Sequence, residues 1–488
     1  MNGMYKNQWY QEIFKVTPNI LEEARAAAEK MGLESLRGRI GLSPASSTCP
    51  GPLPKFVLQA IEEANQIPVL PVRKVEDELR EVVKDIYGDE YDAAVTNTCE
   101  AGLRVAYETL FSPPTMRAGE TYRARFLTPY GEDYDFTAGY GRPFPPKYKG
   151  LLADRSSTSG ELSVEGKSLT NLDAVFVRLV GARYEPHGIK YNPVPLLSQI
   201  DHRKSYERFV QAANRHAAEL TGITAVMYDS PGYGANEKDE KGVPILMKML
   251  GQLAREYDVP FIVDTAASAP VLSSSPRDVG AHIMLWSTDK VIRAPTGGLM
   301  VGEEEIMVPI RKALGLGGER YGELSSHTKA RFSLTDPGRD TVVGLTAVLK
   351  ALRDNPYSFK KPIDEMYTIV KEEFAQFKFD RFLKDMIFTK SYALGGIEIN
   401  YEQTWNHGEF GIPIFSAEDS FANTNLIMAA LVEMGVNPAF VYSANMSLAP
   451  GLGTVDPEGN LMIEPTRLAV RALVRATEIV CDRAGLSQ

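Results

Sequence analysis

Short apolar segments alternate with amphipathic helical segments through most of the first 350 residues. Segments such as "FIVD" at 261–264 and "HIMLWS" at 282–287 are too short for typical helices, and turn residues separate them from their neighbours. This alternation favours a mainly parallel sheet with helices on both faces. Further strands are expected near 92–96, 123–129, 222–230 and 297–302. In such a sheet, ligands bind where the strands reach their carboxyl ends.

The texture of the sequence changes twice along the chain, which predicts three parts. Residues 1–45 read as a helical N-terminal arm, because "NILEEARAAAEKMG" combines helix formers with a final glycine. Residues 46–349 carry the alternation and form a large α/β domain. Residues 350–488 carry helices around weaker strands and form a smaller α+β domain. The segment 131–171 has no clear period, and a loop of that length is typically functional or mobile.

Composition excludes several classes of protein. The formal net charge of −10 disfavours a nucleic-acid partner, although it leaves room for a local basic patch. Three widely spaced cysteines predict reduced thiols and a cytoplasmic location rather than a disulfide framework. No His/Cys cluster has metal-ligand spacing, so we expect no metal. No segment reads as a signal peptide or a membrane-spanning helix, so we expect no membrane partner.

Three polar features fall at predicted strand ends. "TNTCEAG" at 96–102 is a turn that enters a helix, "FIVDTAASAP" at 261–270 places a carboxylate after an apolar strand, and "STDKVIRAPTGG" at 287–298 contains Lys290. Taken singly, each has an ordinary interpretation. The first is a helix cap, the second is a strand-end acid, and the lysine is a solvated surface charge.

Together the three features match the needs of pyridoxal 5′-phosphate. A lysine forms an imine with the cofactor aldehyde. A carboxylate keeps the pyridinium nitrogen protonated, so that the ring accepts electrons, and a helix N-terminus binds the phosphate. Asp264 and Lys290 are 26 residues apart, which is room for one crossover and one strand. The spacing predicts that they lie on neighbouring strand ends.

From about residue 45 onward the chain resembles the fold-type I, aspartate-aminotransferase-like superfamily of pyridoxal-phosphate enzymes. "DKVIRAPTGGLMVG" is similar to the lysine segments of serine hydroxymethyltransferases and selenocysteine-synthase-like enzymes, and "IVDTAASAP" to the aspartate segment of the latter. "EPTRLAVRAL" and the chain length are similar to the tryptophanase and tyrosine phenol-lyase type of β-eliminating lyase. The resemblance implies a large cofactor-binding domain, a small C-terminal domain and a homodimer or homotetramer.

The resemblance also assigns residues to the cofactor. It implies that Lys290 forms the imine and moves the proton at Cα, that Asp264 is the pyridinium partner, and that Ala266 lies under the ring. The remaining cofactor contacts that it implies are the phosphate positions Asn97, Thr98, Cys99 and Ser287, a stacking ring at Tyr130, and a neighbour of the phenolic oxygen at Ser230. Tyr134 competes with Tyr130 for the position of the ring that stacks on the cofactor, and Asp229 competes with Ser230 for the position beside the phenolic oxygen.

For the substrate carboxylate the resemblance implies an arginine, since its planar fork binds a carboxylate with two hydrogen bonds. Arg467 in "EPTRLAV" is the candidate that we expect first. Three other arginines stand behind it, namely Arg471, Arg331 and Arg339.

Two positions depart from the family pattern. Asp289 precedes the lysine where many relatives have His or Gly, and a carboxylate there is unfavourable near a phosphate. We expect it to point away or to pair with Arg293. Thr98 stands in the phosphate turn where many relatives have glycine, which loosens the phosphate assignment.

The motifs specify the superfamily better than the reaction. The interpretation that we favour is an amino-acid lyase or a β/γ-elimination or substitution enzyme, with an aminotransferase or an aldolase-type enzyme as alternatives. A non-catalytic relative that only binds the cofactor is disfavoured, because it would not need Lys290. A dinucleotide-binding enzyme is disfavoured by the missing glycine fingerprint. Segment 131–171 is expected to supply substrate selectivity.

Overall fold

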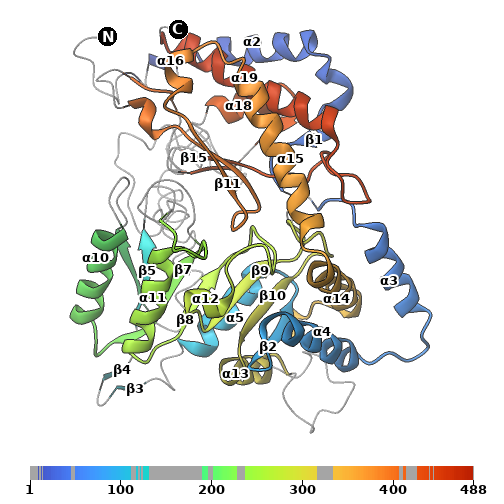
Figure 1. The fold of residues 1–488 in the computed structure, drawn as a ribbon, viewed down its shortest axis with the longest axis vertical. Helices are drawn as coiled ribbons and strands as arrows, with labels where there is room; N and C mark the ends of the chain where they lie inside the picture. The colour runs from blue at the N-terminus through green and yellow to red at the C-terminus, as the bar shows by residue number, and fades with distance from the viewer. Residues whose placement is uncertain are drawn as a thin grey trace, which may run out of the picture.

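The computed structural model separates a large sheet domain from a smaller domain that carries both ends of the described chain (Figure 1). No helix among the described residues is both long enough and apolar enough to cross a bilayer. The residues that the structure describes are 9, 12–13, 15–44, 50–111, 117–118, 121–122, 125–130, 190–195, 202–227, 237–315, 333–405, 410–413, 426–438, 440–442 and 445–486.

The large domain is built on a sheet of seven strands within the described residues. In spatial order these are β2 (Tyr91–Thr96), β10 (Gly298–Glu303), β9 (Ile283–Ser287), β8 (Phe261–Asp264), β7 (Leu220–Val226), β5 (Arg125–Tyr130) and β6 (Lys190–Pro195). The predicted strands are confirmed within a few residues at their ends. All pairs are parallel except those of β10, which runs antiparallel to both neighbours. The sequence pattern did not predict β6 or the reversed direction of β10.

Apolar residues alternate between the two faces of this sheet, and helices cover both. Ile262 of β8 joins one buried cluster, whereas its neighbours Phe261 and Val263 join the other. The Ile262 side is covered by α5 (Cys99–Leu110) and α13 (Glu304–Leu314). The other side is covered by α4 (Val72–Tyr87), α10 (His202–Arg215), α11 (Ile245–Glu256) and α14 (Arg339–Asp354), with α3 (Lys55–Asn65) packed on α14. The predicted fold class is therefore confirmed.

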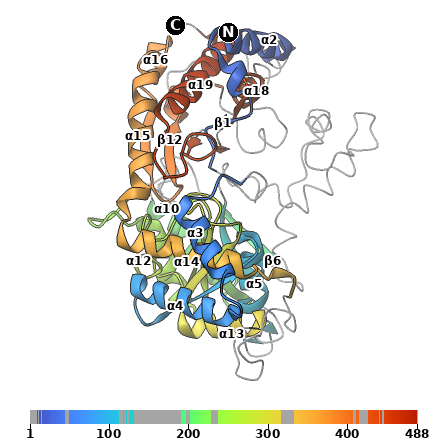
Figure 2. The same ribbon diagram turned by 90° about the vertical axis from the view of Figure 1, so that its right-hand side faces the viewer.

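The small domain forms the upper half of Figure 2, clearly separated from the large domain below it. It packs helices on one antiparallel sheet. The sheet has the order β11 (Ile387–Ser391), β12 (Gly396–Asn400), β15 (Asn445–Leu448) and β14 (Phe440–Tyr442). Its helices are α15 (Tyr357–Phe374), α16 (Asp380–Leu383), α18 (Leu426–Glu433) and α19 (Ile463–Arg483). The smaller elements elsewhere are α12 (Pro276–Val279), the β3 (Arg117–Ala118) and β4 (Thr121–Tyr122) pair, and 3-10 turns η9 (Ser333–Thr335) and η10 (Glu402–Trp405).

The N-terminal segment belongs to the core of the small domain. Helix α2 (Thr17–Lys30) packs on α18 and α19, and Trp9 donates its indole N–H to the carbonyl of Ala484 at 3.1 Å. After the 3-10 turn η1 (Leu33–Leu36), strand β1 (Ile40–Gly41) pairs in parallel with β13 (Val436–Asn437). At the other predicted boundary, α14 continues to Asp354 and packs on the large domain. The polypeptide therefore leaves and re-enters the small domain, near residues 42–54 and 355.

Candidate active site

The three polar features of the sequence share one edge of the large sheet. β8 and β9 are parallel neighbours, with Asp264 in register with Leu285. β10 begins at this edge, where Gly298 pairs with Ser287 on one side and with Thr96 on the other. Because β10 is antiparallel to both β2 and β9, the carboxyl ends of those two strands meet here. The predicted placement of Asp264 and the lysine segment on neighbouring strand ends is confirmed.

Asp264 holds its carboxyl group in a desolvated position. Burial raises its pKa above the ordinary range, against a hydrogen bond from the Ala266 backbone N–H (2.9 Å) and the positive charge of Lys290. The hydrogen bond and the lysine charge therefore offset only part of the cost of burying the ionised carboxylate. A cationic partner placed beside it would lower its pKa and complete the site electrostatically.

Lys290 lies in the turn between β9 and β10. The Arg293 backbone N–H bonds to its carbonyl at 3.1 Å, and the Ala294 N–H bonds to the carbonyl of Thr288 at 2.8 Å, which fixes the loop. The charge of the lysine lowers the pKa of both Asp264 and Cys99 against the dominant effect of burial. Lys290 is thus within electrostatic reach of the acid on β8 and of the first residue of α5.

The 97–99 turn is held as a helix start. Thr98 caps α5, because its hydroxyl oxygen accepts the Ala101 N–H at 3.0 Å. Asn97 is tied elsewhere: its backbone N–H bonds to the carbonyl of Thr335 and its side-chain amide to that of Leu334, both at 2.9 Å. Burial keeps the Cys99 thiol neutral by raising its pKa. The helix terminus is aimed at the shared edge and suits an anion.

Glycine at position 298 brings this turn against the lysine strand. A Cβ at Gly298 would lie 2.4 Å from the carbonyl oxygen of Thr98 and 2.6 Å from Cα of Cys99. Both atoms belong to the backbone, so a side chain there would push β10 away from α5. The absence of a side chain therefore sets the distance between the two segments.

Ser287 and Asp289 form a pair within the lysine segment. The Ser287 hydroxyl donates to the Asp289 carboxylate at 2.8 Å, and both side chains are buried. The sequence led us to expect that Asp289 points away from the phosphate or pairs with Arg293, and the structure shows its carboxylate turned to the Ser287 hydroxyl. The predicted phosphate contact of Ser287 would compete with this hydrogen bond.

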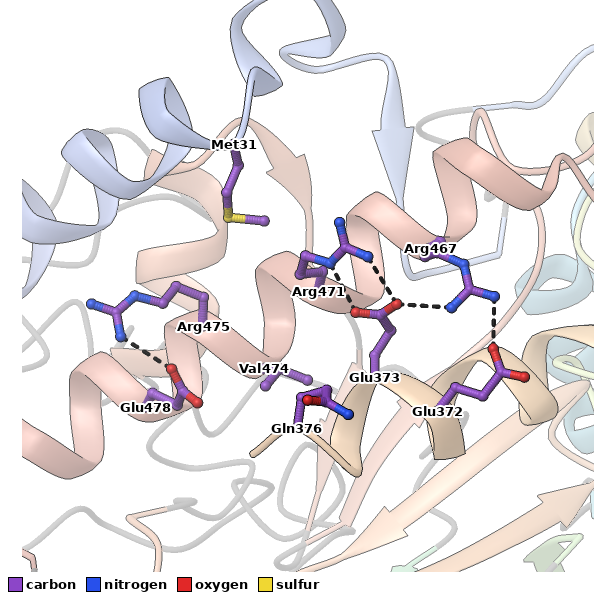
Figure 3. Close-up of a pocket in the computed structure, with 9 residues that line it drawn as sticks. All are labelled: Met31, Glu372, Glu373, Gln376, Arg467, Arg471, Val474, Arg475 and Glu478. Carbon is purple, nitrogen blue, oxygen red and sulfur yellow. Dashed lines mark hydrogen bonds and ion pairs between the residues drawn. The ribbon is translucent and has the colours of Figure 1, made fainter. Parts of the chain in front are cut away.

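The arginine expected to bind the substrate lies in a different groove. Arg467 bonds to Glu373 at 2.9 Å and to Glu372 at 2.6 Å, and Arg471 holds Glu373 with two further bonds (Figure 3). These ion pairs raise the pKa of Arg467. The groove lies between α15 and α19 and has a volume of about 560 Å³. Neither arginine lines the cavity at Lys290. Arg339 is likewise engaged, with Asp340 and Asn65.

A small cavity of about 50 Å³ adjoins the lysine turn. Its lining includes Asp289, Lys290 and Arg293 from the turn, the segment 50–54, and Asp456 from the small domain. Sequence reasoning singled out Arg293 only as a partner for Asp289. The sequence feature that could have indicated a role for Arg293 at the site is its position three residues after Lys290.

Several expected site residues fall outside the described part of the chain. These are Ser230 with its competitor Asp229, Tyr134, Arg331 and the segment 131–171. Tyr130 ends strand β5, and its side chain is likewise outside the description. Ala266 lies just after β8, where its carbonyl accepts the Ser287 N–H at 3.3 Å. Within the described residues, no three His, Cys, Asp or Glu side chains gather as metal ligands would.

No family model matches the sequence, and no curated protein is similar to it in sequence. A crystal structure of SepCysS with the SepCysE N-terminal domain matches with a TM-score of 0.50 at 12% identity, covering 91% of this chain and 96% of the other. An aspartate aminotransferase from Thermus thermophilus has a TM-score of 0.48 at 12% identity, covering 98% and 100%. D-Glucosaminate-6-phosphate ammonia-lyase has 0.45 at 15%, covering 91% and 96%. The match to the SepCysS structure shows that the chain shares its fold, the fold-type I architecture.

Proposed function

We propose that this protein is a pyridoxal-phosphate-dependent enzyme that acts on an amino acid. The observation that carries the proposal is the meeting of three groups at one sheet edge. Lys290 follows β9, Asp264 ends the neighbouring strand β8, and the N-terminus of α5 lies across Gly298. An amine, a buried carboxyl group and an anion-binding helix start are the donor set that this cofactor requires.

The fit extends to the electrostatics of the residues. The pKa of Asp264 is raised by burial, so this group would be stabilised by a protonated pyridine ring. The N–H groups at the start of α5 would bind the phosphate. When bound, the cofactor supplies an electron sink for the substrate carbanion. Lys290 then has two tasks: it holds the cofactor and moves a proton at the substrate Cα.

The donor set is less complete at two of the expected phosphate positions. The backbone N–H and the side-chain amide of Asn97 donate to carbonyls of η9, and the Ser287 hydroxyl donates to Asp289. Thr98 and Cys99 remain at the helix start. The proposal therefore assigns the phosphate first to the backbone of the 98–99 turn, and to Asn97 and Ser287 only after a rearrangement. Ala266, Tyr130 and Ser230 keep their proposed places around the ring.

For the reaction we propose a lyase, or a β/γ-elimination or substitution. The support is the similarity of the 258–302 segment and of "EPTRLAVRAL" to the groups named above. Aminotransferase and aldolase-type reactions are the alternatives. The proposal includes a homodimer or homotetramer, for which the support is the family resemblance, and a cytoplasmic location, for which it is the sparse cysteines. Both Cys99 and Cys481 are buried free thiols.

The first test is optical and chemical. Purified protein given pyridoxal phosphate should turn yellow, and borohydride reduction should fix the cofactor on the peptide that contains Lys290. Lys290→Ala should abolish fixation, because the imine needs its amine. Lys350→Ala, which removes a surface lysine paired with Glu78, is the matched control and should behave as wild type. Colourless protein, or label on another peptide, would refute the assignment.

The second test identifies the reaction. The twenty amino acids are screened for spectral change of the loaded protein, with keto acid, ammonia and aldehyde measured in parallel. Ammonia together with a keto acid from one substrate supports elimination. An aldehyde indicates aldol cleavage, and transfer of the amino group to an added keto acid indicates an aminotransferase. Spectral change without any product would indicate a cofactor-binding protein that is not an enzyme.

A further inference from the structure

Arg293 is a partly buried cation that lacks a hydrogen-bond partner for one of its nitrogens. Nη1 is shielded from solvent, and among the described residues no acceptor binds it. Burial lowers the pKa of Arg293 to about 10, which the charge of Asp456 opposes. A buried donor without an acceptor costs about 1–3 kcal/mol, and more when the group is charged. The guanidinium group is therefore poised for an anion.

The backbone at Arg293 is also unusual. Its φ of +56° lies in the left-handed region, which side chains other than Asn, Asp and Gly seldom adopt. Such strain persists only where surrounding contacts enforce it, and it gathers at functional sites. Here the turn bonds to the Lys290 carbonyl and to Thr288 hold the loop.

The two carboxylates that line the cavity already accept hydrogen bonds. Asp289 accepts the Ser287 hydroxyl, and Asp456 accepts the Asn460 N–H at 2.8 Å within its own turn. Arg293 itself lies over the ring of Phe359 at 5.4 Å, which supports the cation from one side without supplying an acceptor. Arg293 thus has a buried nitrogen without an acceptor in the described structure, while both carboxylates of the cavity accept hydrogen bonds from other groups.

We propose that Arg293 binds the carboxylate of the amino-acid substrate, in place of Arg467. Arg293 and Lys290 line the same cavity, whose volume of about 50 Å³ suits a carboxylate group rather than a whole amino acid, so the carboxylate is the part of the substrate that would enter it beside the guanidinium fork. Arg467 already holds two carboxylates and lies in the groove between α15 and α19. This inference rests on the proposed function, and it assigns the selection of amino acids over amines and amides to Arg293.

The positioning of Arg293 depends on both domains. A Cβ at Gly459 would lie 3.1 Å from Nη2 of Arg293, so the 456–460 turn of the small domain packs directly on the guanidinium. The second contact comes from Phe359 in the first turn of α15, whose ring lies under the guanidinium group. The arginine projects from a large-domain turn into a seat formed by the small domain. The carboxylate would thus bind where the two domains meet.

The test compares amino acids with their carboxamides. The carboxamide keeps the amine that reacts with the cofactor, but it lacks the charged oxygen pair. Dissociation constants are measured by spectral titration for L-alanine, L-serine, L-cysteine and L-phenylalanine and for the four amides. Arg293→Gln should weaken amino-acid binding by about 10- to 100-fold, the loss typical of a hydrogen-bonded charge, and should leave amide binding unchanged. Arg293→Lys keeps the charge without the fork and should lose less.

The control is Arg353→Gln, which removes an arginine of α14 that is ion-paired with Asp85 of α4, and it should change neither constant. Equal losses for acids and amides would show a purely structural role for Arg293, and an unchanged amino-acid constant would refute the inference. A loss that appears in Arg467→Gln instead would return the role to α19. If Arg293→Gln fails to fold, the Lys variant decides. Binding of none of the eight probes to yellow wild-type protein also refutes it, whereas colourless wild-type protein refutes the proposed function itself.

Discussion

At the scale of single residues, some of the candidate site could be predicted from the sequence and some could not. Lys290 and Asp264 could be predicted because each follows an apolar strand, and strand ends of a parallel sheet converge. Arg293 and Asp289 could not be placed, because their partners come from a tight turn and from the other domain. Arg467 was predicted from a motif, but local sequence does not reveal that Glu372 and Glu373 hold it.

Glu76 illustrates the cost of a buried charge at this scale. It lies on α4 with only 3% of its surface exposed, and its Oε1 has no partner among the described residues. Burial raises its pKa from 4.5 to about 7, against the charge of Arg311. The folded state therefore binds the proton more tightly than the unfolded state. Stability from this group is greatest below pH 4.5 and is lost as the pH rises toward 7.

We predict that Glu76→Gln stabilises the protein above pH 7. A pKa moved from 4.5 to about 7 corresponds to about 3 kcal/mol. Denaturant unfolding at pH 8 should show a gain of about 2–3 kcal/mol, which shrinks toward zero near pH 4.5. Glu78→Gln, an exposed position on the same helix, serves as the control. A gain that is the same at both pH values would contradict the electrostatic origin.

At the scale of elements, the candidate site depends on how closely β10 approaches the start of α5. The strand at 297–302 was predicted from its apolar run, whereas its direction was not, because a short apolar segment carries no signal for parallel or antiparallel pairing. The reversal is what brings Gly298 to the edge where Ser287 and Thr96 end their strands. A parallel β10 would have placed its first residues at the opposite edge.

We predict that Gly298→Ala weakens cofactor binding by at least tenfold. The new methyl group meets the backbone of Thr98 and Cys99, which cannot move without displacing α5, and overpacking of this kind typically costs about 1–3 kcal/mol. Cofactor affinity is measured by titrating apoprotein and following the imine absorbance. Gly32→Ala is the control: its left-handed φ of +71° makes the substitution costly to stability, but Gly32 lies in the small domain with no atom within 4 Å of the added Cβ, so cofactor affinity should not change. Unchanged affinity in Gly298→Ala would remove the turn from the phosphate site.

At the scale of the whole molecule, the small domain is assembled from both ends of the described chain. Trp9 stacks on Phe410 with ring centroids 4.4 Å apart, and α2 packs against α18 and α19 (Figure 1). The sequence predicted the helix within 1–45, because helix formers and a stop glycine are local signals. It did not predict where the helix docks, because that contact joins residues more than 400 positions apart.

We predict that Trp9→Ala destabilises the small domain by about 3–5 kcal/mol, the usual cost of truncating a buried aromatic residue. Trp9→Phe keeps a stacking ring and loses only the indole N–H, so it should lose less. Unfolding followed by hydrogen exchange would localise the effect to 363–486. Borohydride fixation at Lys290 should persist, since that residue belongs to the other core. Uniform loss of protection in both domains would contradict this separation.

The pairing of Trp9 with Ala484 also sets an order of events on the ribosome. The two residues are 475 positions apart, and at about 5–20 residues per second their synthesis is separated by about 25 to 95 s. Until α18 and α19 have been made, late in that interval, the apolar face of α2, with Ile20 and Ala24, has no native partner from either helix. The sheet domain, whose strands are all complete by Glu303, has its sequence available first. The nascent chain therefore exposes the apolar face of α2 for long enough that chaperones can bind it.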